Sequence, residues 1–477
     1  MKRKLLLTSF LAVAVVSLSS CNLLPSISSS NPISSSSSST SSSISTTVIK
    51  SEYVNLVAAN DIHGRLVSQD GEYGLDALSS KLKEIEKEYG EFIKIANGDI
   101  FQGKFESNVL YGRPMVDCLN AMDFDAFVIG NHEFDWGLDK IAAYKDGDFT
   151  NGEADFPFLS CNIAYKSNNQ LLEWAEPYTI VENGGNKVGI IGAIGSQLTR
   201  TINAGMVKDY VFLDSVSQIS KYATEIRTNY DVDYVVLAIH DHTESVLKQI
   251  GNLSGDSKID AIFTAHTHQK ENLVVGNNIP VLQGGGNNKN VSIIRLKHGG
   301  HTKRIESLNS VSDPEIKKII DGYVKGEIEV RGNEVIGYNS NYKNSGAMGS
   351  LLANTMKNKF GTDVGITNYA RTGLDAGDIT IKEMYEVYPF DNMILTATIS
   401  GKLLRSFVNY AYSIYYDYEF SLANIEDERI YTIAIIDYVY DNEKNTSYFS
   451  QDPEIRVEQN IYMRDFMIDY IKEVENI

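Results

Sequence analysis

Short hydrophobic runs alternate with helix-like segments over the first part of the chain. The runs are rich in valine and isoleucine and are shorter than most helices, which is typical of strands buried on both faces. They occupy Val54–Ala59, Phe92–Ala96, Ala126–Ile129, Val188–Ile194, Tyr234–Ile239 and Ala261–Thr264. This pattern predicts a layered α/β domain, which we expect between residues 51 and 310.

Polar clusters follow five of these runs. In layered α/β folds, functional residues gather at the carboxyl ends of the strands, which is where these clusters stand. The clusters are Asn60-Asp61-Ile62-His63-Gly64, Asn97-Gly98-Asp99, Gly130-Asn131-His132-Glu133-Phe134-Asp135, Ala238-Ile239-His240-Asp241-His242 and Ala265-His266-Thr267-His268. The sequence therefore predicts one functional site at that edge of the sheets.

The rest of the chain carries its own strand and helix signals. A helix-like segment, Pro314 to Val324, is expected within a linker over residues 311–334, followed by a second, α+β domain over residues 335–477. The last helix of that domain has a hydrophobic face, which predicts core packing. Its members are Met463, Phe466, Met467, Tyr470, Ile471 and Val474.

The chain begins with a pattern typical of secretory signals. Three basic residues precede an apolar stretch, Leu5 to Leu18, that is shorter than the roughly 20 residues of a membrane span. The stretch ends in Leu18-Ser19-Ser20-Cys21, which resembles a bacterial lipoprotein cleavage box. We therefore expect residues 1–20 to be removed and Cys21 to carry lipid, with an uncleaved anchor helix as the alternative. Residues 21–50 are serine-rich and predict a flexible tether.

The balance of charge excludes some partners. The formal net charge is −19, from 62 acidic and 43 basic residues, so the chain lacks the basic excess that binds nucleic acid polymers. Three cysteines are too few for a disulfide framework. Cys118 and Cys161 stand in apolar surroundings and are expected to be buried thiols, with one disulfide between them as the alternative. The protein is expected to be a monomer.

The polar clusters contain donors suited to a pair of divalent metal ions. Hydrolytic sites of this kind combine hard oxygen ligands with neutral imidazoles and share one carboxylate between the ions. Asp61 and His63 are one residue apart, so on an extended segment they point the same way, as do His266 and His268. A single such pair is more often a loop, but five clusters in order favour a metal site. The candidates are Asp61, His63, Asp99, Asn131, His240, His266 and His268.

The order and the residue sequences of the clusters resemble those of the calcineurin-like metallophosphoesterases, and the string Gly130 to Asp135 resembles a motif of the 5′-nucleotidase family. The resemblance implies a layered sandwich that holds two divalent ions (Zn, Mn, Co or Fe) with Asp99 as the bridge. It also implies that His132 is the catalytic histidine, oriented by Asp135. One ion would take Asp61, His63, Asp99 and His268, and the other Asp99, Asn131, His240 and His266. His242 has no counterpart and is expected in solvent or just behind the ligands.

The resemblance extends into the second domain. Asn368-Tyr369-Ala370-Arg371-Thr372-Gly373 and Tyr388-Pro389-Phe390-Asp391-Asn392 are similar to strings of the family's substrate-binding domain. The resemblance implies that Arg371 contacts the anionic end of the substrate and that Phe390 stacks on the base, with core packing as the alternative for Phe390. Tyr438 is the candidate for a second stacking ring. A family string, Gly-Gly-Asp-Gly-Tyr, is missing near Tyr438, and a glycine pair is altered before Arg371.

The predicted function is that of an extracytoplasmic, lipid-anchored hydrolase at the cell membrane that releases phosphate from nucleotides by a 5′-nucleotidase type of reaction. A 2′,3′-cyclic-nucleotide phosphodiesterase, a UDP-sugar hydrolase and a thiosulfate-ester hydrolase are alternatives on the same scaffold. A surface lipoprotein that only binds, with structural metals, is the alternative from another class. The complete set of candidate ligands with His132 and Asp135 argues against it.

Overall fold

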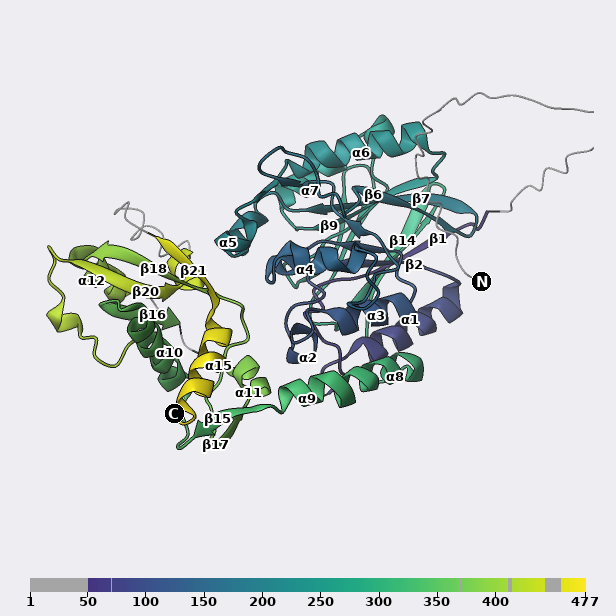
Figure 1. Cartoon of the computed structure of the whole chain (residues 1–477). Helices are drawn as coiled ribbons and strands as arrows, with labels where there is room; N and C mark the ends of the chain where they lie inside the picture. The colour runs from purple at the N-terminus through teal and green to yellow at the C-terminus, as the bar shows by residue number, and fades with distance from the viewer. Residues whose placement is uncertain (1–49, 70, 369, 411–413, 442–455) are drawn as a thin grey trace, which may run out of the picture.

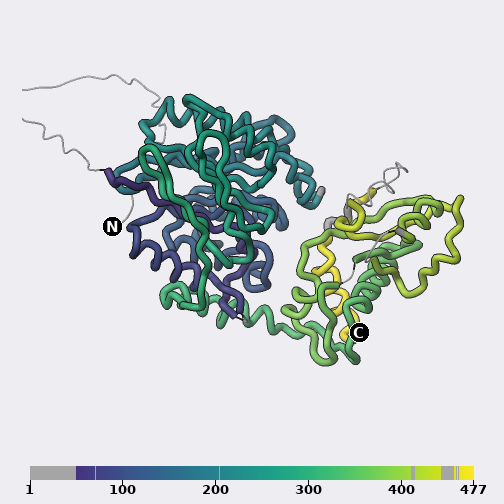
Figure 2. The backbone as a smooth tube through the Cα atoms, turned by 180° about the vertical axis from the view of Figure 1, so that it is seen from behind, coloured from purple at the N-terminus to yellow at the C-terminus, as the bar shows by residue number. Residues whose placement is uncertain are grey.

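The computed structural model describes residues 50–69, 71–368, 370–410, 414–441 and 456–477. The expected signal segment, the serine-rich tether and Cys21 therefore lie outside the described residues. Two bodies are visible, one formed by the purple to teal part of the chain and the other by its green to yellow part (Figure 1). From behind, the green segment of the chain is seen to cross from one body to the other (Figure 2).

Two six-stranded sheets form the first body. The first sheet has the order β14 (Gly300–Ser307), β13 (Asn290–Lys297), β1 (Val54–Ala59), β2 (Ile93–Asn97), β3 (Ala126–Val128) and β4 (Phe158–Leu159). The second has the order β11 (Lys270–Val275), β12 (Ile279–Gly284), β10 (Ala261–Phe263), β9 (Tyr234–His240), β7 (Asn186–Ile194) and β6 (Tyr178–Asn183). All six strands expected from the sequence are present within these sheets.

The two sheets pack face to face because their strands are hydrophobic on both sides. In β1, Leu56 and Ala58 face the core between the sheets, whereas Val57 and Ala59 face the helices outside. Strand β9 divides in the same way, with Val236 in the inner core. This alternation follows from the two-residue period of a strand. The result is the predicted layered α/β architecture.

Helices cover the outer faces of the sandwich. The helices α1 (Leu75–Tyr89), α3 (Arg113–Ala121) and α8 (Pro314–Tyr323) share the core of the first sheet, and α6 (Ser215–Asn229) and α7 (Glu244–Gly251) share that of the second. Shorter elements are α2 (Phe105–Asn108), α4 (Leu138–Ala142), α5 (Ala204–Val207), β5 (Ile163–Tyr165) and β8 (Tyr210–Phe212). Cys118 and Cys161 are buried in these cores as free thiols, as predicted.

A helical linker leads to the second body. Asp313 caps α8 by accepting a hydrogen bond from the N–H of Glu315 at 3.1 Å, and Pro314 occupies the first turn, where it is favoured. Ile316 and Ile320 bury the inner face of α8. A helical turn over residues 324–328 and α9 (Glu329–Gly332) then continue the linker. The helix expected from Pro314 to Val324 is thus present.

The second body has a core of its own. Its five-stranded sheet has the order β19 (Ile414–Tyr416), β16 (Val364–Asn368), β20 (Ile430–Ile436), β18 (Met393–Ser400) and β21 (Val457–Tyr462), and β15 (Val335–Asn339) pairs with β17 (Gly377–Thr380). The helices are α10 (Ser345–Phe360), α11 (Ile381–Val387), α12 (Gly401–Tyr410), α13 (Asp437–Asp441) and α15 (Met463–Val474). This is the predicted α+β domain.

The hydrophobic face of α15 packs in this second core. Met463, Phe466, Met467 and Ile471 are buried there, as predicted. The prediction is wrong for Val474, which occupies the last turn of the helix and is 38 % exposed. Among the residues that the structure describes, no helix combines the length and apolar character needed to cross a membrane.

Candidate metal centre

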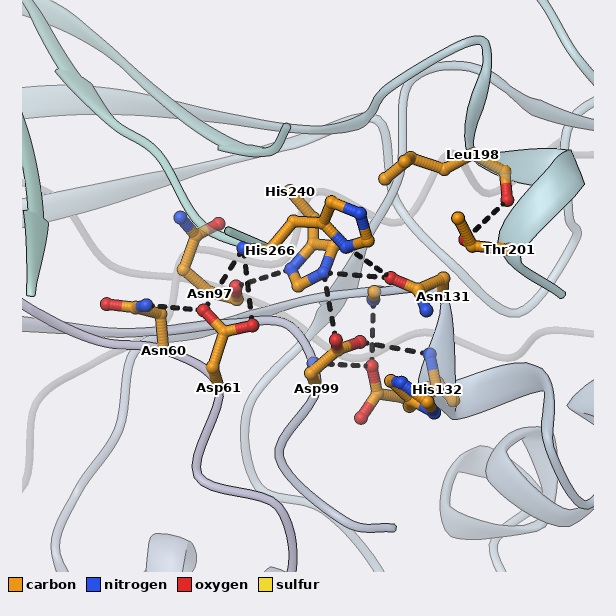
Figure 3. Close-up of polar contacts among 12 residues, drawn as sticks. Asn60, Asp61, Asn97, Asp99, Asn131, His132, Leu198, Thr201, His240 and His266 are labelled. Atoms are coloured by element: carbon orange, nitrogen blue, oxygen red, sulfur yellow. Dashed lines mark hydrogen bonds and ion pairs between the residues drawn. The ribbon is translucent and has the colours of Figure 1, made fainter. Parts of the chain in front are cut away.

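The predicted ligands stand at the carboxyl ends of neighbouring strands. Strands β1, β2 and β3 run parallel, and so do β7, β9 and β10, so the carboxyl ends within each group meet at one edge. Asn97 joins the two sheets at this edge, because its side-chain amide donates to the carbonyl of Phe263 at 3.2 Å. The ligands of one sheet therefore approach those of the other across the sandwich (Figure 3).

The first group of donors comprises Asp61, His63 and His268. Their ligand atoms all lie within 4.8 Å of one another. The Nε2 atoms of His63 and His268 are 3.0 Å apart, and Nε2 of His268 is 3.3 Å from Oδ1 of Asp61. The side chain of Asp61 is fully buried, whereas that of His268 is 39 % exposed. One side of this group is therefore open to solvent.

The second group comprises Asp99, His240 and His266, together with Asn131. Nε2 of His240 lies 3.1 Å from Oδ2 of Asp99 and 3.1 Å from Oδ1 of Asn131. The same Asn131 oxygen is 2.9 Å from Nδ1 of His266. Asp99 also lies in a third set of close donors, with His63 and His132. Its carboxylate thus stands between the two groups, as expected of a bridging ligand.

The backbone at these ligands differs from the expectation of extended segments. Asp61 and His63 have φ angles of 49° and 53°, and His266 and His268 have angles of 80° and 56°. The left-handed region is costly for residues with a side chain and is concentrated at functional sites. The assumption that strand alternation orients each pair is therefore wrong. Tight turns after β1 and β10 instead bring Asp61 and His63 into one group of donors and direct His266 and His268 to different groups.

The protonation of the histidines suits metal binding in the first group. Burial lowers the pKa of His63 to about 4, so its imidazole is neutral at physiological pH. Its Nδ1 is 3.3 Å from the carbonyl of Gln102, which favours a proton on that nitrogen and leaves Nε2 as the free donor. Burial, followed by the charge of His240, also lowers the pKa of His266.

His240 and Asp99 form a tight, fully buried pair. Burial by itself would lower the pKa of His240, but the charge and hydrogen bond of Asp99, together with Asp61 and the carbonyl of Asn97, outweigh burial and raise the pKa to about 9. Burial by itself would raise the pKa of the Asp99 carboxyl, but the charges of His240 and His132 hold this pKa well below its usual range. Nδ1 of His240 faces the carbonyl of Asn97 at 3.1 Å. This arrangement directs Nε2 toward the shared centre.

His132 lies beside Asp99 and pairs with Asp135. The N–H of His132 donates to Oδ1 of Asp99 at 2.9 Å, and its Nδ1 is 2.8 Å from Oδ2 of Asp135. Burial lowers the pKa of His132, but Asp135 and Asp99 outweigh this effect and raise the pKa to about 10. Its side chain keeps 31 % of its surface exposed, so the ring can be reached from the open side of the centre.

Glu133 is a functional residue that the sequence reasoning missed. Its carboxylate is fully buried and accepts hydrogen bonds from the N–H groups of Asp99 and Ile100, each at 2.9 Å, and of Gly130 at 2.8 Å. It thereby fixes the turns after β2 and β3 that carry Asp99 and Asn131. Its position within the string Gly130 to Asp135 was the available signal, because a charged residue between two ligand-type residues needs a partner.

His242 stands apart from the ligands. Its Nδ1 pairs with the carboxylate of Glu271 on β11, and 24 % of its side-chain surface is exposed. It belongs to none of the groups of close donors found in the described part of the chain. The expectation that His242 lies in solvent or behind the ligands agrees with this position.

The donors fit divalent cations. Two carboxylates, an amide oxygen and imidazoles converge from five strand ends, and two of the imidazoles have lowered pKa values that keep them neutral. The carboxylates of Asp61 and Asp99 are both buried, and buried carboxylates need compensating positive charge, which divalent ions supply. The mixture of oxygen and imidazole ligands suits first-row transition metals. The chemistry of the residues therefore matches the expected cofactor.

The predicted substrate residues gather at one edge of the second domain. Arg371 follows β16, which runs parallel to β20, and Tyr438 follows β20. Phe390 precedes β18, which is antiparallel to β20, so it reaches the same edge. The side chain of Arg371 is exposed, and Phe390 and Tyr438 are 49 % and 56 % exposed. Phe390 is thus not a core residue, and the alternative of core packing is wrong.

The two domains match two known families. The calcineurin-like phosphoesterase family matches residues 54–270, and the 5′-nucleotidase C-terminal domain matches residues 324–413. The chain belongs to the calcineurin-like phosphoesterases that carry a 5′-nucleotidase C-terminal domain. This membership confirms the family and the fold class expected from the sequence.

Curated relatives share about a quarter of their residues with the chain. Endonuclease YhcR of Bacillus subtilis is 26 % identical over 78 % of this chain and 34 % of its own length. The cell wall protein Lmo0130 of Listeria monocytogenes is 24 % identical over 75 % of this chain and 56 % of its own. A 5′-nucleotidase of Vibrio parahaemolyticus is 26 % identical over 75 % and 74 %. The chain thus spans about a third of the first relative and just over half of the second.

Solved structures share the fold at low identity. The 5′-nucleotidase precursor of Thermus thermophilus superposes with a TM-score of 0.65 at 19 % identity, covering 89 % of this chain and 97 % of that one. The 5′-nucleotidase of Candida albicans gives a TM-score of 0.61 at 13 % identity, covering 89 % and 99 %. The likeness extends across both domains.

Proposed function

We propose that the protein is a two-metal hydrolase that releases phosphate from nucleotides in a 5′-nucleotidase type of reaction. The proposal rests on one observation. The chain combines a set of metal-binding side chains in its first domain with a second domain whose exposed aromatic and cationic residues lie at one edge of the sheet. A donor set alone would serve any phosphoester. Exposed rings at Phe390 and Tyr438 favour a substrate that carries a base.

Seven side chains would hold the two ions. Asp61, His63 and His268 form the first site, and Asn131, His240 and His266 form the second. Asp99 is shared, as its place between the two groups suggests. When bound, the ions supply Lewis acids for the phosphate and lower the pKa of water. We infer Zn, Mn, Co or Fe from the mixture of carboxylate, amide and imidazole donors.

His132 acts on the leaving group. Asp135 orients the ring through Nδ1, so Nε2 is available to donate a proton or a hydrogen bond to the oxygen that departs from phosphorus. The ring of His63 is 5.2 Å from that of His132, so this proton donor adjoins the first metal site. Loss of His132 should therefore slow the hydrolysis of every phosphoester, with or without a base.

The second domain selects the substrate. Arg371 would bind the anionic end, and Phe390 and Tyr438 would stack on the base. An aromatic face binds any base, because every base has a flat π surface. The relative of Vibrio parahaemolyticus is named a 5′-nucleotidase, and a relative of Bacillus subtilis is named a trifunctional nucleotide phosphoesterase, which agrees with nucleotide substrates.

We place the enzyme on the extracytoplasmic face of the cell membrane, held by lipid on Cys21. The string Leu18 to Cys21 and the serine-rich segment after it support this location, and one relative is named a cell wall protein. Metabolic labelling with an alkyne-bearing palmitate, followed by mass analysis of the membrane-extracted protein, tests it. Labelled wild type and unlabelled Cys21→Ala support the anchor, whereas an unlabelled wild-type chain contradicts it.

A phosphate-release screen tests the activity. Protein stripped by exhaustive chelation should be inactive, and Mn²⁺, Co²⁺ or Zn²⁺ should restore release from nucleoside monophosphates. Cyclic nucleotides and UDP-sugars are tested in parallel with chromatography of the products, because opening the cyclic phosphate or cleaving the pyrophosphate releases no free phosphate; the products separate the alternative reactions of the same site. His132→Ala serves as the inactive control. Full activity after chelation, with metal content measured near zero, would disprove the two-metal reaction.

A further inference from the structure

Two hydrogen bonds join the domains beside the residues that are proposed to stack on the base. Nε1 of Trp136 donates to Oδ2 of Asp391 at 2.8 Å, and Asp391 directly follows Phe390. The amide nitrogen of Asn203 donates to the carboxylate of Asp437, which directly precedes Tyr438. Each proposed stacking ring is therefore one residue away from an aspartate that is bonded to the first domain.

The contact at Trp136 is part of a buried polar cluster. Asp391 is 9 % exposed and Trp136 is 6 % exposed. The guanidinium of Arg464, 3 % exposed, pairs with the other carboxylate oxygen of Asp391 and donates to the carbonyl of Tyr388 at 3.0 Å. Buried charges require such partners. The position of Asp391, and with it that of Phe390, is fixed from both domains.

Trp136 also connects this cluster to the catalytic turn. It directly follows Asp135, whose carboxylate holds Nδ1 of His132. Its ring packs against Tyr111 in an edge-to-face contact with the ring centroids 5.7 Å apart. Tyr111 has a φ angle of 51°, which is rare for a bulky residue and marks a strained position. The turn that carries His132 therefore also places Trp136 against the second domain.

The contact at Asn203 belongs to the segment that follows β7. This segment touches the metal centre at its start, because the backbone N–H of Gly195 donates to the carbonyl of His240 at 3.1 Å, and it continues through residues 198–201 to Asn203. Asn203 caps α5 by accepting from the N–H of Gly205 at 2.7 Å, and its amide nitrogen remains available for Asp437. Asp437 also accepts from the N–H of Met393 at 2.9 Å, which ties the ends of β18 and β20 together.

We propose that Trp136 and Asn203 are positioning residues that set the distance between the phosphate site and the base-binding rings. Through Asp391 and Asp437 they hold Phe390 and Tyr438 at a fixed place relative to His132 and the metal ligands. Neither residue contacts the reacting phosphate. The inference rests on the proposed nucleotidase function and names the residues of this chain that make it selective for nucleotides.

The two bonds act together because they restrain the same sheet edge at two points. Each bond fixes this edge at one point, and the two together, with the contact of the Phe105 and Tyr385 rings (centroids 5.1 Å apart), define its orientation toward the first domain. Loss of either bond should raise KM for a nucleotide, and loss of both should raise it further. About tenfold per bond is the size expected for a hydrogen bond to a buried carboxylate. A phosphoester without a base should respond much less.

Two conservative variants remove the bonds and little else. Trp136→Phe keeps an aromatic ring against Tyr111 but lacks the N–H donor. Asn203→Ser keeps a side-chain oxygen that can cap α5 but lacks the amide donor. Trp174→Phe is the matched control, because Trp174 packs on Phe158 in the first domain, with the ring centroids 5.7 Å apart. Correct folding of each variant is checked by its thermal unfolding and metal content.

KM and kcat for AMP and for p-nitrophenyl phosphate are measured with the full chain, and small-angle X-ray scattering records the spread of domain orientations. We expect about a tenfold rise in KM for AMP in each single variant, a larger rise and a broader scattering distribution in the double variant, and no change in Trp174→Phe. Unchanged KM in the double variant, or equal losses on both substrates, would overturn the inference. Wild-type protein that releases no phosphate from AMP would instead overturn the proposed function.

Discussion

The carboxylate of Glu133 accepts a hydrogen bond from the backbone N–H of Asp99 at 2.9 Å. The side chain of Asp99 contacts His240, so Glu133 supports the shared ligand from the backbone side without contacting the ion sites itself. Burial raises the pKa of Glu133 to about 7, which indicates that its charge depends on these N–H donors. The bond therefore links the geometry of the metal centre to a residue outside the ligand set.

Glu133→Gln should weaken metal binding. Glutamine has the same length, but its NH₂ group replaces one acceptor oxygen and faces backbone N–H donors that are then left unsatisfied. Changes behind metal ligands typically cost about 10–100-fold in metal affinity. Titration of Mn²⁺ or Zn²⁺ into chelated protein measures the loss. Glu173→Gln, at an exposed position of the same domain, is the control. Equal affinity in Glu133→Gln and wild type would show that the backbone turns hold Asp99 unaided.

Gly98→Ala should disrupt the centre by a different route. Gly98 has a φ angle of 78°, and an added Cβ would lie 2.3 Å from Nδ1 of His240 and 2.9 Å from Cα of Gly130. The left-handed backbone costs about 1–2 kcal/mol for alanine, and the collision with His240 and Gly130 adds about 1–3 kcal/mol. The free energy of unfolding, from urea titration, measures the sum.

Gly361→Ala separates these two terms. Gly361 has a φ angle of 63° but no neighbouring atom within 4 Å of an added Cβ, so only the backbone cost applies. We expect Gly98→Ala to be less stable than Gly361→Ala by the collision term, and to lose metal as well. Equal losses of stability with full metal content would mean that the turn after β2 relaxes freely.

The strands and the placement of the proposed ligands at the strand ends could be predicted from the sequence because both depend on local pattern. The run from Val54 to Ala59 is apolar except at Asn55, as expected of a strand buried on both faces, and β1 has these bounds. Asp61, Asp99 and His240 follow such runs directly. Parallel pairing then brings the strand ends together, as the contacts within the centre show.

The features that could not be predicted from the sequence depend on tertiary contacts or on backbone conformation. The left-handed conformation falls on His63 and His266 themselves, and neither is a glycine, so residue type does not signal it. The partner of Trp136 is 255 positions away, and the partner of Asn203 is 234 positions away. No local pattern specifies such pairs, because each depends on how the second domain packs on the first. The predicted domain boundaries also stay predictions.

Removal of His240 should cost more metal than removal of His268. His240 is fully buried and its Nε2 contacts both Asp99 and Asn131, whereas the side chain of His268 is 39 % exposed at the open side. His240→Ala leaves the buried Asp99 without its partner, so we expect loss of both ions and a lower melting temperature. His268→Ala should retain part of the metal. Metal analysis after gel filtration compares them, and the reverse order would refute the assignment.

The two described cysteines should be unreactive in the folded protein. Burial raises the pKa of Cys161 to about 12 and also raises that of Cys118, so the reactive thiolate is scarce at pH 8 for both. Iodoacetamide at pH 8 should label neither position natively and both after denaturation without a reductant. Peptide mapping identifies the labelled positions. Absence of label at both positions after denaturation would indicate a disulfide instead.

Phe390→Ala should impair nucleotides more than simple phosphoesters. Phe390 is 49 % exposed at the sheet edge that also carries Arg371 and Tyr438, so its ring is available to a base. Stacking contributes about 1–3 kcal/mol per base, and about 1.4 kcal/mol is a factor of ten. We expect roughly a tenfold loss in kcat/KM for AMP and a smaller loss for p-nitrophenyl phosphate.

Two comparison variants show whether this loss comes from stacking. Tyr418 is 60 % exposed but follows β19, which is antiparallel to β16, so it lies at the opposite edge of the sheet from Arg371. Tyr418→Ala should therefore leave both substrates unchanged. His132→Ala should reduce turnover of both substrates, because its proposed role is at the leaving oxygen, which both substrates have. If Phe390→Ala instead lowers both substrates equally while the protein stays folded, its ring does not bind the base, and substrate selection must come from Arg371 and Tyr438.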